Sequence, residues 1–309
     1  MENTPDINTA KTEPPEARSP DILCIGSVLW DVIGRSENAM RQGSDMPGRI
    51  TRLPGGVALN IGMALARFGL QPALLSAVGR DAEGAALIEA CEIRGLITSF
   101  IYRLDDLPTD KYMAVEGSNG LIAAIADAHS LEAAGAKILL PLSDDRLPQP
   151  YTGAVALDGN LTPELLAQMA HSPLLAEADL RVAPASPGKA LRLSPFVQAG
   201  RGTIYVNLEE AGLLCQASFT SSAEAAEALL ARGALRAVVT HGGAPASVGS
   251  AMGLITQQPP QVHVARVTGA GDTFMAAHIS AELKGADPEA ALAQALDAAA
   301  LYVSGETKI

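Results

Sequence analysis

One stretch of the sequence reads Val264-Ala265-Arg266-Val267-Thr268-Gly269-Ala270-Gly271-Asp272-Thr273-Phe274. A β-branched run passes there through small residues into a helical pattern, whose apolar positions Met275, Ile279 and Leu283 repeat every four residues and predict one apolar helix face. Small residues let backbone N–H groups at a helix start approach an anion, and the helix dipole adds about half a positive charge there. The stretch therefore predicts a phosphate site where a strand passes into a helix.

Asp272 stands in the first turn of this predicted helix. Ionised beside those N–H groups, its carboxylate can accept a proton from a hydroxyl held near the same anion. Taken alone, Gly269-Ala270-Gly271 fits equally well an ordinary tight turn in which Asp272 is a favourable first-turn charge. A dinucleotide fingerprint fits poorly, because Phe274 stands where a third glycine is needed and the turn lies near the C-terminus. The Walker A spacing of Gly and Lys is absent, as is the Gly-x-Ser-x-Gly elbow.

A second glycine motif is Gly55-Gly56-Val57-Ala58-Leu59-Asn60, and it leads into helical residues that continue up to Gly69. Two glycines ahead of a helix permit close approach of a ligand to the backbone, and the Asn60 amide offers a donor and an acceptor for a polyol. The alternative is a loop followed by a helix with a buried, satisfied amide. Asp31, which follows the first apolar run, is likewise either a hydroxyl acceptor or a turn residue.

Short apolar runs recur along the chain and are typical of strands buried on both faces of a sheet. They lie at Ile22–Ile25, Ala73–Ala77, Ala154–Leu157, Thr203–Val206 and Ala237–Thr240. Helical stretches lie between them, so the pattern predicts an α/β fold with a mainly parallel sheet and helices on both faces.

The ends of several predicted helices can be read directly. The helical stretches 58–68 and 85–94 each stop at a glycine, Gly69 and Gly95, which takes the left-handed conformation beyond a helix end without strain. Ser221 with Glu224 predicts a capping box. Thr162-Pro163 and Asp287-Pro288 each pair an N-cap residue with proline at the first helical position.

One segment interrupts the alternation of strands and helices. Lys111–Glu116 and Leu121–Ala126 are β-capable runs separated by Gly117-Ser118-Asn119-Gly120, and Asn-Gly is a strong hairpin signal. We expect a small antiparallel element that serves as a lid or side sheet.

The composition limits the class of protein. With 309 residues and 48% hydrophobic side chains, the chain can bury a large core. The 22 Lys and Arg residues and 34 Asp and Glu residues give a net charge of −12, which argues against nucleic-acid partners. Cys24, Cys91 and Cys215 are far apart and suit a reduced compartment better than a disulfide scaffold. No apolar run of 18 residues and no signal-peptide pattern occurs, so we expect a cytoplasmic protein that does not bind membranes.

Together the two glycine motifs resemble the signature regions of the ribokinase-like (PfkB-type) sugar and nucleoside kinases. The resemblance runs from about Ile22 to Val303, with Gly55-Gly56, Asn60 and Gly69, then Gly79, in the first region and Gly269-Ala270-Gly271-Asp272 in the second. Within the family, the stretches 120–127 and 183–190 look most similar to the pseudouridine kinase branch. The resemblance implies a three-layer αβα, doubly wound fold. Residues 1–20 would be a polar tail, and residues 21–309 would form the kinase domain, with β-lid elements near 35–53 and 99–127.

The resemblance also implies a role for individual residues. Asp272 would take the proton from the acceptor hydroxyl of a small sugar or nucleoside, and the N–H groups of Gly269, Ala270 and Gly271 would form the anion hole for the phosphoryl group of ATP. Glu210 would reach Mg²⁺ through water; taken alone, it is an ordinary solvated glutamate. Substrate contacts would come from Asp31, Gly55, Gly56, Asn60 and Lys189, the last of which is equally well a surface lysine. Nucleotide contacts would come from Asn207, Thr240, Gly242, Thr268 and Ala298.

The sequence departs from the family pattern at three places. Arg266 stands where cation-activated members place an acidic residue of their monovalent-cation site, so we expect no ordinary potassium site and hypothesise that the guanidinium supplies positive charge near the anion hole. Gly62 is a mild change, whereas Asp110-Lys111 replaces small lid residues and bears on substrate choice. A homodimer through the lid is common in the family. A catalytically silent sugar- or nucleotide-binding regulator, a kinase for another sugar and a dinucleotide-dependent oxidoreductase are the alternatives.

Overall fold

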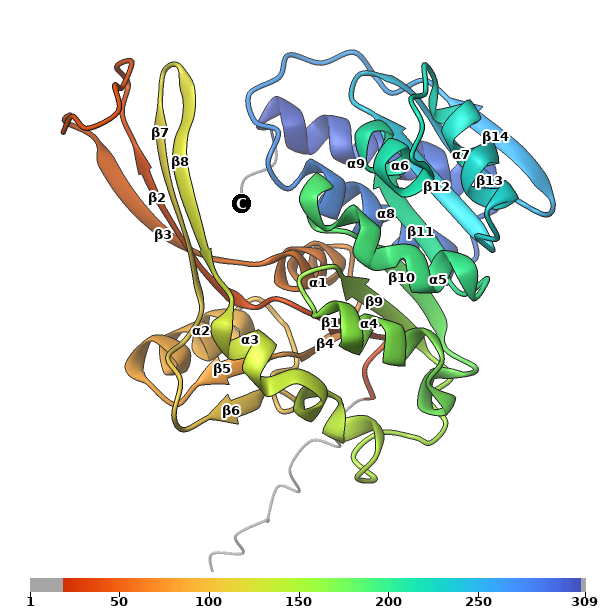
Figure 1. The fold of residues 1–309 in the computed structure, drawn as a ribbon, viewed down its shortest axis with the longest axis horizontal. Helices are drawn as coiled ribbons and strands as arrows, with labels where there is room; N and C mark the ends of the chain where they lie inside the picture. Colours follow the sequence, from red (N-terminus) through yellow and green to blue (C-terminus); the bar gives the residue numbers. More distant parts are fainter. Residues whose placement is uncertain (1–18, 307–309) are drawn as a thin grey trace, which may run out of the picture.

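The computed structural model describes residues 19–306, and its main sheet has the strand order β14-β13-β12-β11-β10-β9-β1-β4 (Figure 1). The six strands from β12 to β4 run parallel, and β13 and β14 continue the sheet antiparallel. The strands are β1 (Ile22–Ile25), β4 (Pro72–Leu75), β9 (Ala154–Asp158), β10 (Asp179–Ala183), β11 (Thr203–Asn207), β12 (Arg236–His241), β13 (Ala244–Ser250) and β14 (Gly253–Gln257).

Helices cover both faces of this sheet, which explains why all four residues of β1 are fully buried. Ile22 and Cys24 face one helix layer, and Leu23 and Ile25 face the other. The first layer contains α1 (Val57–Arg67), α2 (Ala82–Glu92), α8 (Ala270–Leu283) and α9 (Pro288–Ser304). The second contains α3 (His129–Ala134), α4 (Pro163–Ala170), α5 (Ser194–Gln198), α6 (Leu208–Cys215) and α7 (Ser222–Ala231), with 3₁₀ turns at Gly135–Leu142, Pro173–Leu175 and Pro187–Leu193. The expected three-layer αβα arrangement is confirmed.

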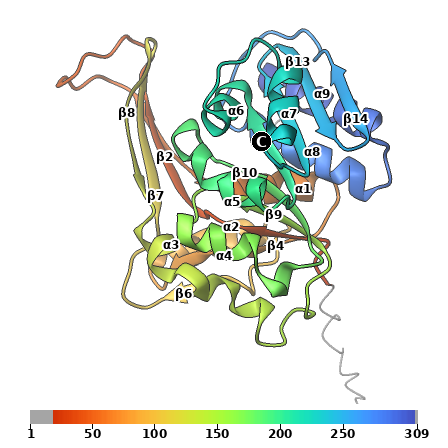
Figure 2. The same cartoon turned by 45° about the vertical axis from the view of Figure 1, so that its right-hand side comes forward.

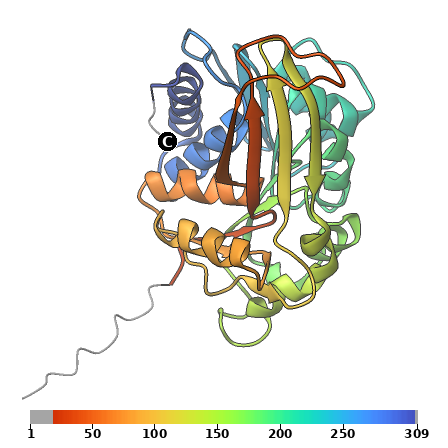
Figure 3. The same cartoon turned by 90° about the vertical axis from the view of Figure 1, so that its left-hand side faces the viewer.

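A four-stranded sheet with the order β3-β2-β7-β8 stands away from the main sheet, and we call it the lid sheet (Figures 1 and 2). Seen from the side in Figure 3, its strands lie next to one another in front of the helices. They are β2 (Leu29–Arg35), β3 (Arg49–Gly55), β7 (Lys111–Gly117) and β8 (Gly120–Asp127), and β7 and β8 form the expected hairpin. The lid therefore begins earlier than the expected range 35–53. Within 99–127, β6 (Tyr102–Leu104) instead pairs in parallel with β5 (Ala77–Gly79) in a separate small sheet.

The helix ends follow the sequence signals with one exception. Gly69 and Gly95 have φ angles of 86° and 82°, and the Thr162 and Asp287 side chains accept the expected capping bonds. The Ser221–Glu224 capping box is only half formed. Ser221 accepts from the Glu224 N–H, but the Glu224 carboxylate accepts from the neighbouring Thr220 N–H instead.

Helix α8 was expected to have one apolar face, and this expectation is wrong. Eight consecutive residues, 274–281, are buried, whereas Leu283 is 41% exposed. The helix packs against the sheet, α1 and α9, so its sides are covered and small residues such as Ala276 and Ala277 let neighbouring helices approach. The predicted tail, residues 1–20, lies almost wholly outside the described residues.

Candidate active site

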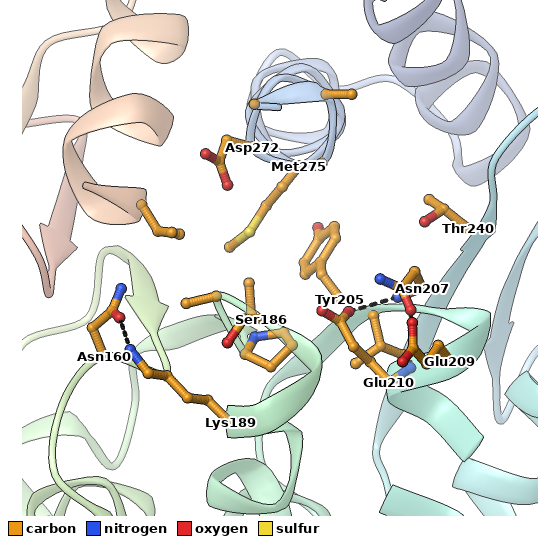
Figure 4. A pocket seen from close by; sticks show the side chains of 18 of the residues that line it. Asn160, Ser186, Lys189, Tyr205, Asn207, Glu209, Glu210, Thr240, Asp272 and Met275 are labelled. Atoms are coloured by element: carbon orange, nitrogen blue, oxygen red, sulfur yellow. Dashed lines mark hydrogen bonds between the residues drawn. The ribbon is translucent and has the colours of Figure 1, made fainter. Parts of the chain in front are cut away.

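A cavity of about 1650 Å³ opens between the lid sheet and the carboxyl ends of strands β9 to β12. This edge is the usual ligand position in open parallel sheets, because loops and helix starts converge there. The starts of α1, α6 and α8 all border the cavity. Figure 4 shows Asp272 and Met275 on α8 lying across the cavity from Ser186 and Lys189.

The start of α8 has the open geometry that an anion site needs. Gly269 is its N-cap with a φ of 86°, which is a left-handed conformation that favours glycine. A Cβ at Gly271 would meet nothing within 4 Å, so the backbone there faces open space. One of the three expected N–H donors is already used, because the Ala270 N–H donates to the Val267 carbonyl at 3.0 Å.

Asp272 meets Asn60 at this point, although 212 positions separate them in sequence. The Asn60 Nδ2 group donates to Asp272 Oδ2 at 3.0 Å, and so joins the first turns of α1 and α8. Burial raises the pKa of Asp272 to about 7, against the opposing effect of the Asn60 hydrogen bond, and the negative charges of Asp158, Asp31 and Glu210 add to the rise. A carboxyl group with a pKa near neutral is suited to accept a proton during catalysis.

Asp31 reaches the cavity from strand β2 of the lid sheet. A Cβ on Gly55 would lie 2.0 Å from Asp31 Oδ2, so the carboxylate needs a glycine in the opposing strand. A Cβ on Gly56, whose φ is 97°, would lie 2.5 Å from the Ser27 carbonyl oxygen, so this position also needs a glycine. Gly56 lines the cavity, and Gly55 lies behind Asp31. Burial raises the pKa of Asp31 to about 6.

Asp158 is a buried residue of the site that sequence reasoning missed. Its Oδ2 atom accepts from the Ser27 N–H and Oγ, both at 2.8 Å, and from the Ala58 N–H at 2.9 Å. The Ser27 Oγ also accepts from the Val57 N–H, so these two side chains cap α1 in place of the N-cap residue Gly56. The signal was an aspartate that ends the apolar run 154–157, at the edge where the other polar residues gather.

Lys189 is held by Asn160, which is a second residue the sequence did not indicate. Lys189 Nζ donates to Asn160 Oδ1 (Figure 4), and Asn160 Nδ2 in turn donates to Ser27 Oγ at 2.9 Å. Lys189 is half-buried, and burial lowers its pKa. Within residues 19–306, Lys189 is the only Lys or Arg lining the cavity, whereas the lining carboxylates are Asp31, Asp110, Glu209, Glu210 and Asp272. Asp110 is buried and accepts from the Ser130 and Leu131 N–H groups, so it caps α3.

The expected nucleotide residues lie at the other end of the cavity, with one exception. Asn207 and Glu210 form a complete capping box at the start of α6, with N–H to side-chain oxygen distances of 2.9 Å and 2.8 Å (Figure 4). Thr240, Gly242 and Thr268 line the same region. Ala298 lies on α9 and does not line the cavity, but packs against the apolar core.

Taken alone, the sequence predicts that the Glu210 carboxylate is solvated, but the structure buries this residue. Glu210 is 8% exposed, and burial raises its pKa, although the bond from the Asn207 N–H opposes the rise. In the part of the chain that the structure describes, no group of three or more His, Cys, Asp or Glu side chains could enclose a metal ion.

The comparisons place the chain in a family. Residues 19–307 match the pfkB family carbohydrate kinases, and the chain belongs to this family. It is 27% identical to the pseudouridine kinase of Escherichia coli over 260 residues, covering 82% of this chain and 81% of that protein. It is 28% identical to the ribokinase of Bacillus subtilis over 299 residues, covering 92% of each. A shorter match, 32% identical over 145 residues, covers 47% of this chain and 39% of an uncharacterized sugar kinase, YeiI, of Escherichia coli.

Solved structures agree with this assignment at the level of the fold. The Arabidopsis thaliana ribokinase complexed with ribose and ATP has a TM-score of 0.78 at 20% identity, with 94% of each chain covered. The ribokinase-like fold and the kinase class are therefore confirmed. Among residues 19–306, no helix combines the length and apolar character that a membrane span requires.

Proposed function

We propose that this kinase transfers the γ-phosphoryl group of ATP to a hydroxyl of an uncharged sugar or nucleoside, with pseudouridine as the first candidate. The observation that carries the proposal is the position of Asp272, in the first turn of α8 beside the open backbone of Gly271 and bonded to Asn60. A proton acceptor and an anion-binding helix start then meet the same reacting atoms.

The reaction follows from this arrangement. The acceptor hydroxyl would lie against Asp272, which takes its proton as the oxygen attacks the γ-phosphorus in line, while the bond from the γ-phosphorus to the bridging oxygen breaks and ADP leaves. Asn60 keeps the Asp272 carboxylate oriented, and the start of α8 stabilises the negative charge on the transferred group. The lid sheet carries Asp31 toward the acceptor, so closure of the lid would both position the acceptor and exclude water.

The charges of the cavity support an acceptor without a phosphate group. Lys189, its single Lys or Arg among the described residues, already donates to Asn160, while Asp31 and Asp272 face the acceptor space. A sugar phosphate would bring about two further negative charges against these carboxylates, and the single positive charge of Lys189 would offset only part of them. The curated relatives agree, because pseudouridine kinases of Escherichia coli and Arabidopsis thaliana and a ribokinase are among them. A simple sugar such as ribose is the second candidate.

ATP and Mg²⁺ would occupy the end of the cavity near Asn207, Glu210 and Thr240. The carboxylate of Glu210 lines the cavity and its Oε2 atom is engaged by the Asn207 N–H, which suits a contact to Mg²⁺ through water rather than an enclosing ligand set. The bound ion would supply neutralising charge to the nucleotide phosphates. The start of α8 and the turn at Thr268 would hold those phosphates by their backbone.

A phosphorylation screen tests this function. The purified chain with Mg-ATP is offered pseudouridine, uridine, adenosine, ribose and fructose 6-phosphate, and the products are separated by mass. We expect pseudouridine or ribose to be phosphorylated and fructose 6-phosphate to be refused.

Asp272→Asn should lower kcat by about 10²- to 10⁴-fold while ATP still raises the melting temperature. The matched control is Asp297→Asn, an exposed carboxylate on α9. Normal turnover by Asp272→Asn would exclude Asp272 as the base.

A further inference from the structure

Tyr302, near the end of α9, touches the turn that precedes the active-site helix. Its hydroxyl donates to the Thr268 carbonyl at 2.8 Å. A Cβ at Gly269, the N-cap of α8, would lie 2.5 Å from the same hydroxyl. The tyrosine therefore lies directly against the backbone that leads into Asp272, although Tyr302 itself is not part of the cavity lining.

Arg266 holds Tyr302 from the other side. Its Nε donates to the Tyr302 carbonyl at 2.8 Å, and its Cζ atom lies 3.9 Å from the centre of the Tyr302 ring. A guanidinium stacked on an aromatic face is attracted by the ring, and a cation is favoured at the carbonyl end of a helix. The Arg266 guanidinium, which was hypothesised to supply positive charge near the anion hole, thus packs against the end of α9, and Arg266 does not line the cavity.

Backbone bonds complete the attachment of this segment. The N–H groups of Ala265 and Arg266 both donate to the Val303 carbonyl, at 2.9 Å and 3.1 Å. The segment 265–268, whose residues are exposed or half-buried, is therefore tied to the last turn of α9 rather than to the core. The turn at Thr268 also has bonds of its own, from the Ala270 N–H to the Val267 carbonyl and from the Thr273 N–H and Oγ1 to the Gly269 carbonyl, and the contacts to α9 fix the turn relative to that helix.

We infer that Arg266 and Tyr302 are positioning residues, which clamp the Thr268–Gly269 turn so that the start of α8 and Asp272 keep their reactive geometry. The inference rests on the proposed function, because that function gives the α8 start its catalytic role. Neither side chain needs to touch a ligand. The hydroxyl of Tyr302 sets the position of a carbonyl, and Arg266 keeps the tyrosine in place.

The matched pair of variants is Tyr302→Phe and Tyr102→Phe. Tyr302→Phe removes the hydroxyl but keeps the ring on which Arg266 stacks. Tyr102 is also half-buried with a cation over its ring, Lys137 at 5.7 Å, and it lies on β6 outside the cavity lining. We expect Tyr302→Phe to lower kcat about tenfold or more, with both KM values changed less than about twofold, since a small displacement of reacting groups acts mainly on turnover. Tyr102→Phe should behave as the wild type.

Hydrogen–deuterium exchange gives a readout that does not depend on activity. Backbone amides in 264–273 should exchange faster than in wild type in both Tyr302→Phe and Arg266→Gln. Their exchange rates should be unchanged in Tyr102→Phe. The double variant should lose no more kcat than the worse single variant, because both act on one turn. Turnover is normalised to the folded fraction from thermal melting, so unfolding cannot imitate the effect.

Unchanged exchange in 264–273, or wild-type kcat per folded Tyr302→Phe molecule, overturns the clamp. A failed phosphorylation screen with faster exchange would overturn the proposed function alone.

Discussion

At the scale of single residues, the site depends on Asp272 and Asp31, two half-buried carboxylates that the fold partly shields from water. Asp272 and Asp31 share a cavity with three other lining carboxylates and one lysine, so each ionises less readily than in solution. In the proposed reaction, a pKa raised to about 7 lets Asp272 both accept and release a proton near neutral pH. The same burial that makes it reactive costs stability whenever it is ionised.

The pH dependence of kcat/KM follows from this. Asp272 must be ionised to accept a proton, so activity should rise with pH through about 7 and level off above it. Below pH 6, protonation of Asp31 adds to the loss, and the decline should become steeper than tenfold per pH unit. The measurement is kcat/KM from pH 5 to 9 with ATP and the accepted substrate. A profile that stays flat between pH 5.5 and 8 would contradict the role of Asp272.

The stability of the folded chain should show the opposite trend. The pKa of Asp272 is about 7 in the folded state and near its ordinary value of 3.8 in the unfolded state, so the folded state binds the proton more tightly. The free energy of unfolding therefore falls as the pH rises from 3.8 to about 7. Asp272→Asn should therefore raise Tm relative to wild type at pH 8 and raise it less at pH 5. Thermal melts at the two pH values, with Asp297→Asn for comparison, measure the difference. An equal effect of Asp272→Asn at both pH values would argue against a buried ionised carboxylate.

Local sequence located part of this site and missed part of it. Gly269, Gly271, Asp272 and Asn60 were expected from small residues at helix starts, and they meet in the structure. Asp158 could not be found in this way, because an aspartate after a strand is an ordinary turn residue until the fold brings Ser27 and Ala58 to it. Its capping role depends on Ala58, which lies 100 positions away in the sequence, and no local pattern indicates such a contact.

At the scale of elements, α8 carries the proposed catalytic residue Asp272 at one end and a buried charge network at the other. Glu282, in its last turn, forms ion pairs with Arg181 of β10 and Arg236 of β12. Above them, the Tyr205 hydroxyl lies 2.8 Å from His278 Nδ1, and the Arg181 guanidinium donates to the same hydroxyl at 3.2 Å. The network fixes the C-terminal part of α8, from His278 to Glu282, against the sheet.

Polar residues of this network also explain why the sequence analysis did not predict strand β10. Strand β10 did not register as an apolar run, because Asp179 and Arg181 alternate with the buried Leu180 and Val182. A charge in the middle of a strand is normally a sign of solvent. Here Arg181 is buried because carboxylates of its own strand and of α8 neutralise it. The sheet was expected, but the partner of a buried arginine cannot be read from one strand.

Removing Glu282 should destabilise the chain strongly. Burial opposes ionisation of Glu282, but the hydrogen bond from Arg236 and the charge of Arg181 outweigh it and lower its pKa to about 2. Glu282→Gln leaves two largely buried arginines without that carboxylate, and breaking such pairs costs about 3–5 kcal/mol. Urea unfolding at pH 7 measures the loss, with the exposed Glu289→Gln of α9 as control. The difference from wild type should persist at pH 7 and shrink as pH falls below about 4.5 toward 2. A loss of less than about 1 kcal/mol in the free energy of unfolding would contradict the prediction that this network stabilises the fold strongly.

At the scale of the whole molecule, the net charge of −12 and the acidic cavity leave few side chains for an anionic nucleotide. In the proposed function, binding would then rely on backbone N–H groups at helix starts and on the counter-ion that accompanies the nucleotide. This is consistent with a cavity at the carboxyl edge of the sheet, which the starts of α6 and α8 line. The fold, more than any cluster of lysines, would then provide the positive end of the site.

The lid sheet carries an apolar face that a single chain leaves uncovered. Register places Val32, Met113 and Ile125 side by side on the face opposite Asp31, with Ile50 one pair further along. Ile50, Met113 and Ile125 are 79%, 47% and 62% exposed. Burial of such side chains contributes about 1.5–3 kcal/mol each, and β8 is an open edge strand. We therefore propose a homodimer in which a second copy covers this face.

Sedimentation velocity over a range of protein concentrations tests the dimer. We expect wild type to sediment as a dimer at micromolar concentration, and Ile125→Asp to sediment as a monomer, because a charge in an apolar interface must be desolvated without a partner. Met252→Asp is the matched control, since Met252 is 96% exposed at the turn between β13 and β14, which belong to the main sheet and not to the lid sheet. If the lid face also sets lid closure, Ile125→Asp should raise the KM of the acceptor more than that of ATP, because Asp31 sits on the same sheet. A monomeric wild type, or a dimer that survives Ile125→Asp, would place the covering surface elsewhere.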